Sequence, residues 1–565
     1  MMLSDLVKYY EALVNKGILG GEGWELCKVG YGIVLGEDGQ VLDIRDIRES
    51  VKVGKKSKLV PVSKLFTERA KRSTNIAANY MMDNTSYMIS SIEDLRKFTA
   101  TQDLHMEVLK GFNGSAARKV KNYFNKYAIA VENNEELKHK VDECIKNAQN
   151  ITFIDEKGNY LIDDNEIRDA WNKYKSENSN DETDGRCILT GEPDKIARTH
   201  GKIKGFRNAQ SSGASLVSNA SSCSESYGME DAQSINSRVG EYASFAYVNA
   251  VNYMLTRREN SNYIGNACVC VWTDEIDSRL EEIISRYIIL NGLNEEGMKY
   301  AKEHKNETVH IACLVPNTAR IAEKFYYVNS CDEVIKALDK FSEIVSISYA
   351  DIDKVEYSQR SYGLSAIMNE TVNQNGTDID ERISTTEVAL LMQSIFKGIK
   401  FPESVYLNIL KRINNEKKIS YSKVGFIKAY LIRNCGKEEL IKMGLNDECE
   451  DKAYIIGRMV SIMDSIQYAA TGNSNIAERH LSSMSAAPGQ ILPILLVKVG
   501  QFAEKNGKCY EYKNKLEEML GKLGGKIPDK FDLSERGMFM LGYYHEEQDK
   551  FRRINEAKIK KEQNK

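Results

Sequence analysis

The sequence contains no long hydrophobic run and no closely paired cysteines, and each absence excludes a class of protein. The most apolar stretch, residues 491–497, is far shorter than the roughly 20 residues that span a bilayer, and Pro493 interrupts it. None of the eleven cysteines belongs to a C-x-x-C pair, and none of the seven histidines completes a metal-binding spacing. We therefore expect no membrane segment, no metal, no cofactor, and cysteines that stay reduced inside the protein.

Signatures of catalysis are also missing. The sequence has no G-x-x-x-x-G-K-[ST] phosphate loop and no His-Asp dipeptide, and His545-Glu546 lacks the second histidine that a zinc protease needs four residues later. Ser215 lies in GASLV, without the closing glycine of a nucleophile elbow. The pair Asp351 and Asp353 could hold Mg²⁺, but paired acids are commonplace. The sequence therefore predicts a protein that is not an enzyme.

The chain is long enough for several domains. Its 565 residues are 28% charged and 42% hydrophobic, which is typical of a soluble globular protein. The opening residues MMLSDLVKYYEALV place Asp5 and Lys8 within an apolar pattern and predict an amphipathic helix instead of a signal peptide. We expect a cytoplasmic protein.

Charge is distributed unevenly, although the net charge is only −3. Basic residues dominate from Lys52 to Arg72 and again in RKVKNYFNK, which begins at Arg118, whereas acidic residues dominate from Asp163 to Asp184. A single charged run is usually a solvated surface. Several basic islands with interleaved Tyr and Asn favour a groove that binds a polyanion.

The pattern of apolar residues predicts an α+β protein that ends in helices. YGIVLGEDGQVLDI and ITFIDEKGNYLI predict β-hairpins, and the alternating thiols of Cys268 and Cys270 predict a buried strand. Strands vanish beyond about Ser384, where helices are expected at 386–398, 402–414, 421–435, 451–470, 489–505, 510–523 and 534–552. The predicted regions are a mixed N-terminal region (1–175), a second α+β region (186–383) and a C-terminal helical domain (384–565).

One stretch combines cations with small polar residues: RTHGKIKGFRNAQSSGASLVSN, residues 198–219. Its small residues permit a turn whose backbone N–H groups converge on an anion. Lys202, Lys204 and Arg207 would attract phosphates. Asn208 and Gln210 have side chains that can both donate to and accept from a base edge. A flexible surface loop is the alternative on these residues alone.

This stretch and several others resemble one protein family. The sequence CILTGEPDKIARTHGKIKGFRNAQSSGASLVSNASSCSESYGMEDAQSINSRVGEYASFAYVNAVNYML resembles the signature of the large subunit of the type I-C CRISPR surveillance complex, Cascade. RSTNIAANYMMDNTSYMIS, LVPNTARIAEKFYYVNSCDEVIKALDKF, FPESVYLNILKRINNEKKISYSKVGFIKAYLIRN and GYYHEEQDKF are similar to the same family, in the expected order. The chain departs from the family at Ala78, where a proline is usual, and at Ala220, where an aromatic residue is usual.

The resemblance implies a non-catalytic subunit of a ribonucleoprotein. Such large subunits work with the CRISPR guide RNA and with backbone and repeat-processing subunits. They recognise the protospacer-adjacent motif (PAM) in target double-stranded DNA, help to open the duplex, hold the displaced strand and recruit a separate helicase-nuclease. Guide pairing reads the target sequence itself. Two other classes stay open: a metal-dependent nuclease with an unrecognised carboxylate site, and a purely structural scaffold.

Two groups of residues are candidate DNA contacts. Cations are expected to bind phosphates, and amides or hydroxyls to read the motif or line the turn. Capping of a turn is an equal alternative for any single asparagine. The candidate phosphate ligands are Lys71, Arg72, Arg118, Lys119, Lys121, Lys202, Lys204 and Arg207. The candidate motif readers are Asn75, Asn79, Asn84, Asn208, Gln210, Ser211 and Ser212.

The C-terminal helices resemble the small-subunit fold of the same complexes from about residue 443. In this family the small subunit can arise from an internal translation start, and Met443 is the candidate. The upstream residues Lys437, Glu438 and Glu439 can be encoded by a purine run that bacterial ribosomes recognise. Arbitrary codons at a solvent-facing turn are the alternative.

Overall fold

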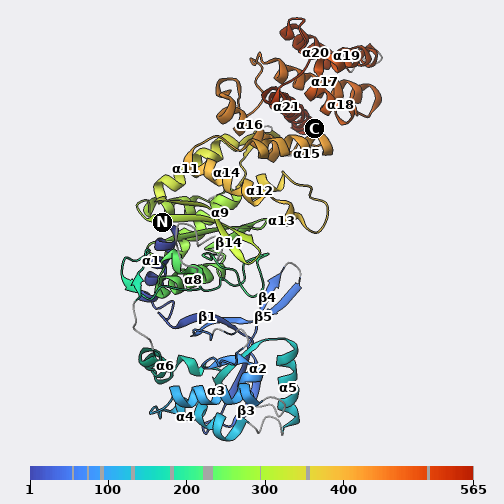
Figure 1. Ribbon diagram of the computed structural model, residues 1–565. Coiled ribbons are helices and arrows are strands. Elements are labelled where there is room, and N and C mark those ends of the chain that lie inside the picture. The colour runs from blue at the N-terminus through green and yellow to red at the C-terminus, as the bar shows by residue number, and fades with distance from the viewer. Residues whose placement is uncertain are drawn as a thin grey trace. The chain divides into compact units, whose positions relative to one another are not determined.

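The chain folds into two compact units, each with its own hydrophobic core (Figure 1). The computed structural model describes residues 1–53, 56–70, 72, 75–89, 95–128, 134–178, 184–219, 233–292, 294–350, 357–504 and 509–563. The first unit comprises Met1–Phe206 and Gln210–Arg257, and the second Arg207–Ala209 and Arg258–Lys565. Helices and strands occur in both units and the chain ends in helices, which confirms the predicted α+β class. The predicted boundaries near 175–186 and 383–384 stay a prediction.

The first unit combines short strands with helices. Its elements are α1 (Met2–Asn15), β1 (Trp24–Val29), β2 (Tyr31–Leu35), β3 (Val41–Asp46), β4 (Glu49–Val53), β5 (Lys56–Val60), β6 (Val62–Thr67), β7 (Met82–Asn84), α2 (Thr85–Met88), α3 (Leu95–Val108), α4 (Ser115–Asn122), η1 (Tyr123–Tyr127), α5 (Glu135–Lys146), β8 (Asn150–Asp155), η3 (Leu161–Asp163), α6 (Asn165–Asn178), β9 (Gly185–Arg186), β10 (Pro193–Asp194), η5 (Gln233–Ser237) and α8 (Glu241–Leu255).

A four-stranded sheet organises the core of the first unit. Its order is β3-β2-β8-β7, in which β2 and β3 form the first predicted hairpin and β8 runs parallel to β2. Ile33 and Phe153 face each other across β2 and β8 and share one apolar core with Phe98, Val120 and Phe124 of α3, α4 and η1. A separate antiparallel pair joins β1, which follows α1, to β6, which precedes the segment 69–84 that ends in β7; this segment is called the 69–84 loop below.

The second unit carries an antiparallel sheet followed by helices. Its elements are β11 (Ser261–Ile264), β12 (Ala267–Thr273), α9 (Ser278–Leu290), α10 (Glu295–Glu303), β13 (Thr308–Asn317), β14 (Arg320–Ser330), α11 (Cys331–Val345), β15 (Ile347–Ala350), β16 (Tyr357–Arg360), α12 (Leu364–Asn369), α13 (Ile379–Arg382), α14 (Thr385–Lys397), α15 (Glu403–Glu416), α16 (Tyr421–Cys435), η6 (Glu438–Leu440), α17 (Lys452–Thr471), α18 (Ile476–Ala486), α19 (Pro488–Glu504), α20 (Tyr510–Leu523) and α21 (Leu533–Gln563).

The sheet of the second unit has the order β11-β12-β13-β14, and every residue of β12 is buried. Cys268 and Cys270 point to the same side of β12, with their sulfur atoms 3.7 Å apart, as the alternation of the sequence predicts. The other side of the strand carries Val269 and Val271, which belong to the same core as Ile284 of α9. Within the described residues no helix is both long and apolar enough to cross a membrane.

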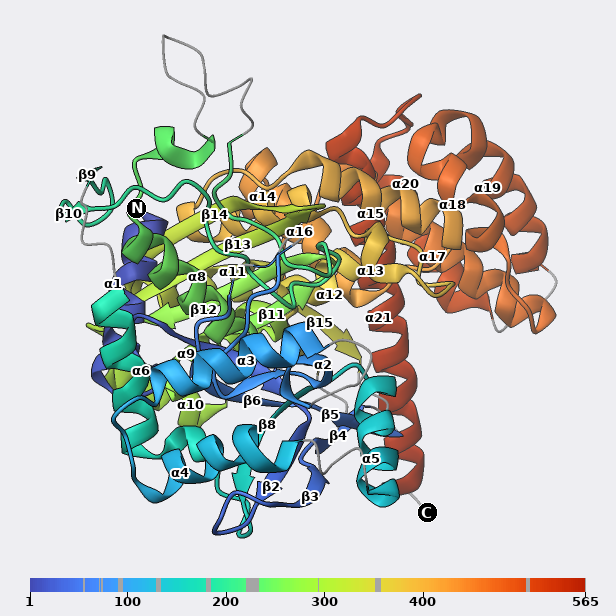
Figure 2. The same cartoon turned by 60° about the horizontal axis from the view of Figure 1, so that its bottom comes forward.

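Helices α17 and α21 form the centre of the C-terminal helical stretch, and α21 is one continuous helix of 31 residues (Figure 2). Close contact between them depends on two glycines. A Cβ atom on Gly457 would collide with the carbonyl oxygen of Phe539, and one on Gly542 would collide with that of Tyr454. The backbones of the two helices therefore approach more closely than any other residue type at these positions allows.

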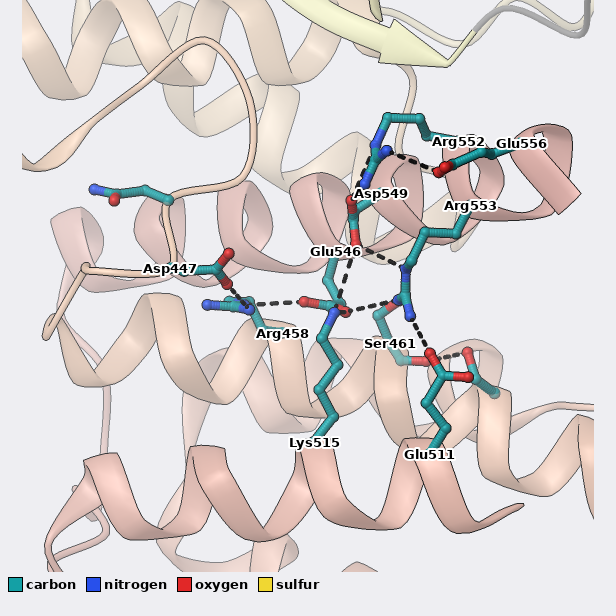
Figure 3. Close-up of polar contacts among 12 residues, drawn as sticks. Asp447, Arg458, Ser461, Glu511, Lys515, Glu546, Asp549, Arg552, Arg553 and Glu556 are labelled. Carbon is teal, nitrogen blue, oxygen red and sulfur yellow. Dashed lines mark hydrogen bonds and ion pairs between the residues drawn. The ribbon is translucent and has the colours of Figure 1, made fainter. Parts of the chain in front are cut away.

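A buried ionic cluster joins these helices. Glu546 of α21 is 2% exposed and accepts hydrogen bonds from Arg458 Nε of α17 at 3.0 Å and from Lys515 Nζ of α20 at 2.5 Å. Arg458 is fully buried and also donates to Asp447 at 2.6 Å, while Arg553 lies 3.6 Å from Glu546 (Figure 3). A buried carboxylate is tolerated only when such cations surround it.

Glu546→Gln should strongly destabilise the protein, because it keeps the shape of the side chain but removes the buried charge partner of Arg458 and leaves only the exposed Asp447. Breaking a buried pair from one side costs about 3–5 kcal/mol. Glu517→Gln is the matched control, since Glu517 is 62% exposed and its pair with Lys513 is 3.9 Å long. Denaturant unfolding followed by circular dichroism measures both variants. Equal midpoints for the two would contradict a stabilising role of the cluster.

Candidate nucleic-acid interface

The segment 198–206 is anchored to the first unit by its apolar and buried polar residues. His200 is buried, and its Nδ1 lies 2.6 Å from the hydroxyl of Tyr247 on α8. Burial lowers the pKa of His200 to about 4, so this histidine is neutral at pH 7 and adds no positive charge to the segment. Ile203 and Ala214 exchange two backbone hydrogen bonds, of 2.8 and 2.9 Å, which close the base of the Gly/Ser turn.

The turn itself requires a glycine. Gly213 has a φ of +99°, and a Cβ atom there would lie 2.8 Å from Cβ of Lys202. The N–H of Gly213 donates to the carbonyl oxygen of Gln210 at 2.9 Å. Gln210, Ser211 and Ser212 are exposed at this turn. Their exposure is compatible with the predicted contacts, which stay a prediction.

Lys202 and Lys204 are two free cations of this segment. Both are exposed, and neither amino group has an ion pair in the part of the chain that the structure describes. Asn252 of α8 fixes the backbone between them, because it accepts from Lys204 N at 2.9 Å and donates to Lys202 O at 3.4 Å. The two side chains are therefore presented from an ordered main chain.

The second predicted segment, the 69–84 loop, begins at a contact with Glu25 of β1. Glu25 accepts a hydrogen bond from the backbone N of Arg69 at 3.1 Å and also pairs with the Arg69 guanidinium. Desolvation by surrounding protein atoms lowers the pKa of Lys204, and the like charge of Arg69 lowers it further while Glu25 opposes the shift. Arg69 has Glu25 as its ion-pair partner, whereas Lys204 has no such partner among the described residues, so its charge is available to an added anion.

Arg72 is the organising cation of the 69–84 loop. It forms a bidentate pair with the buried Asp83, and its Nε donates to the Ala77 carbonyl at 2.5 Å. Its guanidinium carbon lies 3.9 Å from the centre of the Tyr87 ring. A role for Arg72 in phosphate binding stays a prediction, and Lys71 lies outside the described residues.

The asparagines of this loop differ in exposure. Asn79 is 6% exposed, and its Oδ1 accepts from the backbone N of Ala70 at 2.8 Å, which is the contact of a turn cap. Asn75 and Asn84 are exposed, and the Asn84 side chain accepts from Ser86 at 2.7 Å. Motif reading by these three residues stays a prediction, with Asn75 and Asn84 the accessible ones.

The basic island at 118–126 is less exposed than its sequence suggests. Lys119 is 7% exposed and pairs with Glu37 at 3.1 Å. Lys121 donates to the Phe112 carbonyl at 2.6 Å and to Asn113 at 3.0 Å. Arg118 alone of the three predicted ligands is an exposed side chain without an ion pair among the described residues. Phosphate binding by these three residues stays a prediction.

Arg207 and Asn208 belong to the second unit. Arg207 pairs with Asp380 at 2.9 Å and lies 4.6 Å from the centre of the Tyr263 ring, while its backbone N donates to the Tyr263 hydroxyl at 3.2 Å. Asn208 has a φ of +56° and donates to Asn266 at 2.7 Å. Tyr263 and Asp380 are distant from Arg207 in the chain, so no local pattern could identify them as its partners.

The residues that position the candidate DNA contacts could not be predicted from the sequence. Neither Glu25 nor Asp83 lies in a recognisable binding motif. The only sequence signal near Asp83 is its neighbour Asn84, which is a candidate motif reader. The described residues contain no cluster of three potential metal ligands, and Asp351 and Asp353 lie outside them. Met443 is in an irregular segment before α17, where its carbonyl oxygen accepts from Ser348 N at 3.1 Å.

Comparison of the sequence with known protein families identifies one that matches it. The sequence model of the family described as CRISPR-associated protein (Cas_Csd1) matches residues 6–551, which is nearly the whole chain. No curated protein matches the chain. The match extends over both units and includes the anchored Gly/Ser segment, the 69–84 loop and the C-terminal helices. The chain therefore belongs to the Cas_Csd1 family of CRISPR-associated proteins.

Proposed function

We propose that the chain is the large subunit of a type I-C Cascade complex, and that it recognises the PAM in target double-stranded DNA. The single observation that carries the proposal is that Lys202 and Lys204 are exposed, lack an ion pair among the described residues and are presented from a backbone that Asn252 holds. Excess positive charge on an anchored backbone, with exposed amides alongside, suits phosphate positioning and motif reading.

The same proposal assigns no chemistry to the chain. In it, the subunit works with guide RNA and with backbone and repeat-processing subunits, helps to open the duplex, holds the displaced strand and recruits a separate helicase-nuclease, while guide pairing reads the target sequence. Within this role Arg72, Asp83 and Asn79 shape the reading loop, and Lys202 and Lys204 contact phosphates. The test is PAM-dependent binding of a target duplex by the assembled complex.

Lys202→Ala/Lys204→Ala should weaken binding of the complex to a PAM-containing duplex and lower the salt slope by roughly 1 for each lost phosphate contact. The loss should be similar for every motif variant, because phosphates carry no sequence information. Fluorescence anisotropy over a range of salt concentrations measures the slope. Lys299→Ala/Lys302→Ala on α10 is the matched control, since these lysines are also exposed. An unchanged slope in the first variant would remove these residues from the interface.

Asn84→Ala should change the preference among PAM sequences, whereas Asn79→Ala should change the affinity for all of them. Asn84 is exposed, so its loss should relax the preference among motif variants, with about 1–3 kcal/mol per good base contact. Asn79 caps the Ala70 backbone inside the loop, so its loss should weaken binding to all motifs together. Affinities for a panel of duplexes that differ only in the PAM separate the two outcomes. Equal loss on all motifs for Asn84→Ala would exclude base reading by that residue.

Expression of the wild-type gene should yield a short second polypeptide that starts at Met443 and copurifies with the complex. Such a product keeps α17–α21 and every residue of the ionic cluster around Glu546, which lies wholly beyond residue 443. Silent recoding of codons 437–439, or Met443→Leu, should remove the short band and leave the full-length chain. Mass spectrometry of the band identifies its first residue. A band that persists after both changes would place the start elsewhere.

A further inference from the structure

A group of aromatic rings surrounds one arginine on the surface of the second unit. Arg360 ends β16, and its guanidinium carbon lies 5.6 Å from the ring centre of Tyr349 on β15 and 5.3 Å from that of Tyr421, the first residue of α16. Arg360 also donates to the Tyr421 hydroxyl at 2.9 Å. Tyr421 stacks on Tyr362, with ring centres 5.1 Å apart. We call Tyr349, Arg360 and Tyr421 the Arg360 cluster.

The register of the hairpin explains why these side chains meet. Arg360 pairs with Ile347 across β15 and β16, so Arg360 and Tyr349 lie diagonally on one face of the hairpin. The opposite face is fixed to α21, because the Tyr357 hydroxyl lies 3.3 Å from Asp549 and the backbone N of Ala350 donates to Gln548 at 2.9 Å. The cluster is therefore mounted on a rigid support.

Arg360 differs from most of the other arginines that stack on tyrosine rings. Five of those have a carboxylate partner: Arg48 with Asp46, Arg72 with Asp83, Arg207 with Asp380, Arg279 with Glu296 and Arg552 with Asp549. Arg360 has none in the described parts of the chain, and it is exposed. Its charge is thus available to an anion from outside, at a place where the protein already offers an aromatic ring.

The accessible ring is that of Tyr421, which is 36% exposed. Lys417 and Lys418 precede it by only a few residues and are also exposed. Exposed aromatic rings beside cations are the elements that single-stranded nucleic acids use, since an unpaired base can stack on a ring while its phosphate meets a cation. Bases inside a duplex are already stacked on both faces and cannot do so.

We propose that the Arg360 cluster binds single-stranded nucleic acid, with a base stacked on Tyr421 and a neighbouring phosphate on Arg360. The inference rests on the proposed function, because an opened duplex is the source of such a strand. It adds a site in the second unit, separate from the duplex contacts assigned to the first unit. Tyr362 supports the ring of Tyr421 from below the surface, since it is 8% exposed.

Variants of two residues test the site in the full-length protein. Tyr421→Leu keeps apolar volume but removes the stacking ring, and should weaken binding of a fluorescent oligothymidine at least roughly fivefold. Tyr421→Phe keeps the ring and should bind close to wild type. Arg360→Gln should weaken binding and lower the salt slope by roughly 1. Tyr510→Leu is the control, because Tyr510 is 71% exposed on α20 and has no arginine beside it among the described residues.

A second measurement covers any variant that folds poorly. Ultraviolet cross-linking of wild-type protein to an oligonucleotide that contains 5-iodouracil should attach the base to Tyr421 or Tyr349, as mass spectrometry would show. Attachment only elsewhere would overturn the inference, and so would wild-type oligothymidine affinity in Tyr421→Leu. If that variant instead loses other subunits of the complex while its affinity for oligothymidine persists, the cluster is a protein contact and the inference is wrong.

PAM-duplex binding by the assembled complex separates this inference from the proposed function. Variants of the Arg360 cluster should keep the affinity for a closed duplex, since their effect needs an unpaired strand. If wild type binds neither the duplex nor the single strand, the proposed function and this inference fail together. If wild type binds both and Tyr421→Leu is unchanged, only the Arg360 cluster is excluded.

Discussion

Neutralisation of the buried Glu546 carboxylate is the constraint on which the C-terminal helices depend. Its cations come from three elements: Arg458 from α17, Lys515 from α20 and Arg553 from the same helix, α21. Apolar contacts are not directional and tolerate sliding of one helix along another. Charge pairs of about 3 Å do not, so the cluster fixes the register in which the glycine contacts between α17 and α21 can form. Such a cluster can fix the register of packing as well as stabilise the helices.

Pairing between acidic side chains and arginines also occurs in the first unit, close to the candidate interface. Asp83 is buried and holds Arg72, and Glu25 holds Arg69, so acids of the interior set the positions of surface cations. This divides the basic residues of the chain into two kinds. Those that neutralise an internal acid build the loops, whereas Lys202 and Lys204 have no such partner in the described residues and leave positive charge unbalanced. Both kinds are needed, because a free cation attracts phosphate usefully only from a fixed backbone.

The periodicity of apolar residues predicted the positions of most C-terminal helices. It did not predict which polar residues are buried or what they contact. The helices expected at 421–435 and 510–523 coincide with α16 and α20, since glycines with positive φ end both. The helix α18, over 476–486, was missed because its Ser-rich sequence lacks a strong apolar stripe. The second predicted hairpin has β8 and a single bridge from Ile154 to Tyr160, after which the chain turns into η3. Burial of Asn79 depends on contacts that no local pattern encodes.

A chain of net charge −3 can still bind a polyanion, because phosphates do not respond to the net charge. At physiological ionic strength the screening length is about 8 Å, so exposed charges farther away contribute little. A phosphate placed near Lys204 would be attracted by Lys204 and Lys202, neither of which has an ion pair among the described residues. In the proposed function, binding is decided by which cations lack an internal partner, and composition cannot reveal that.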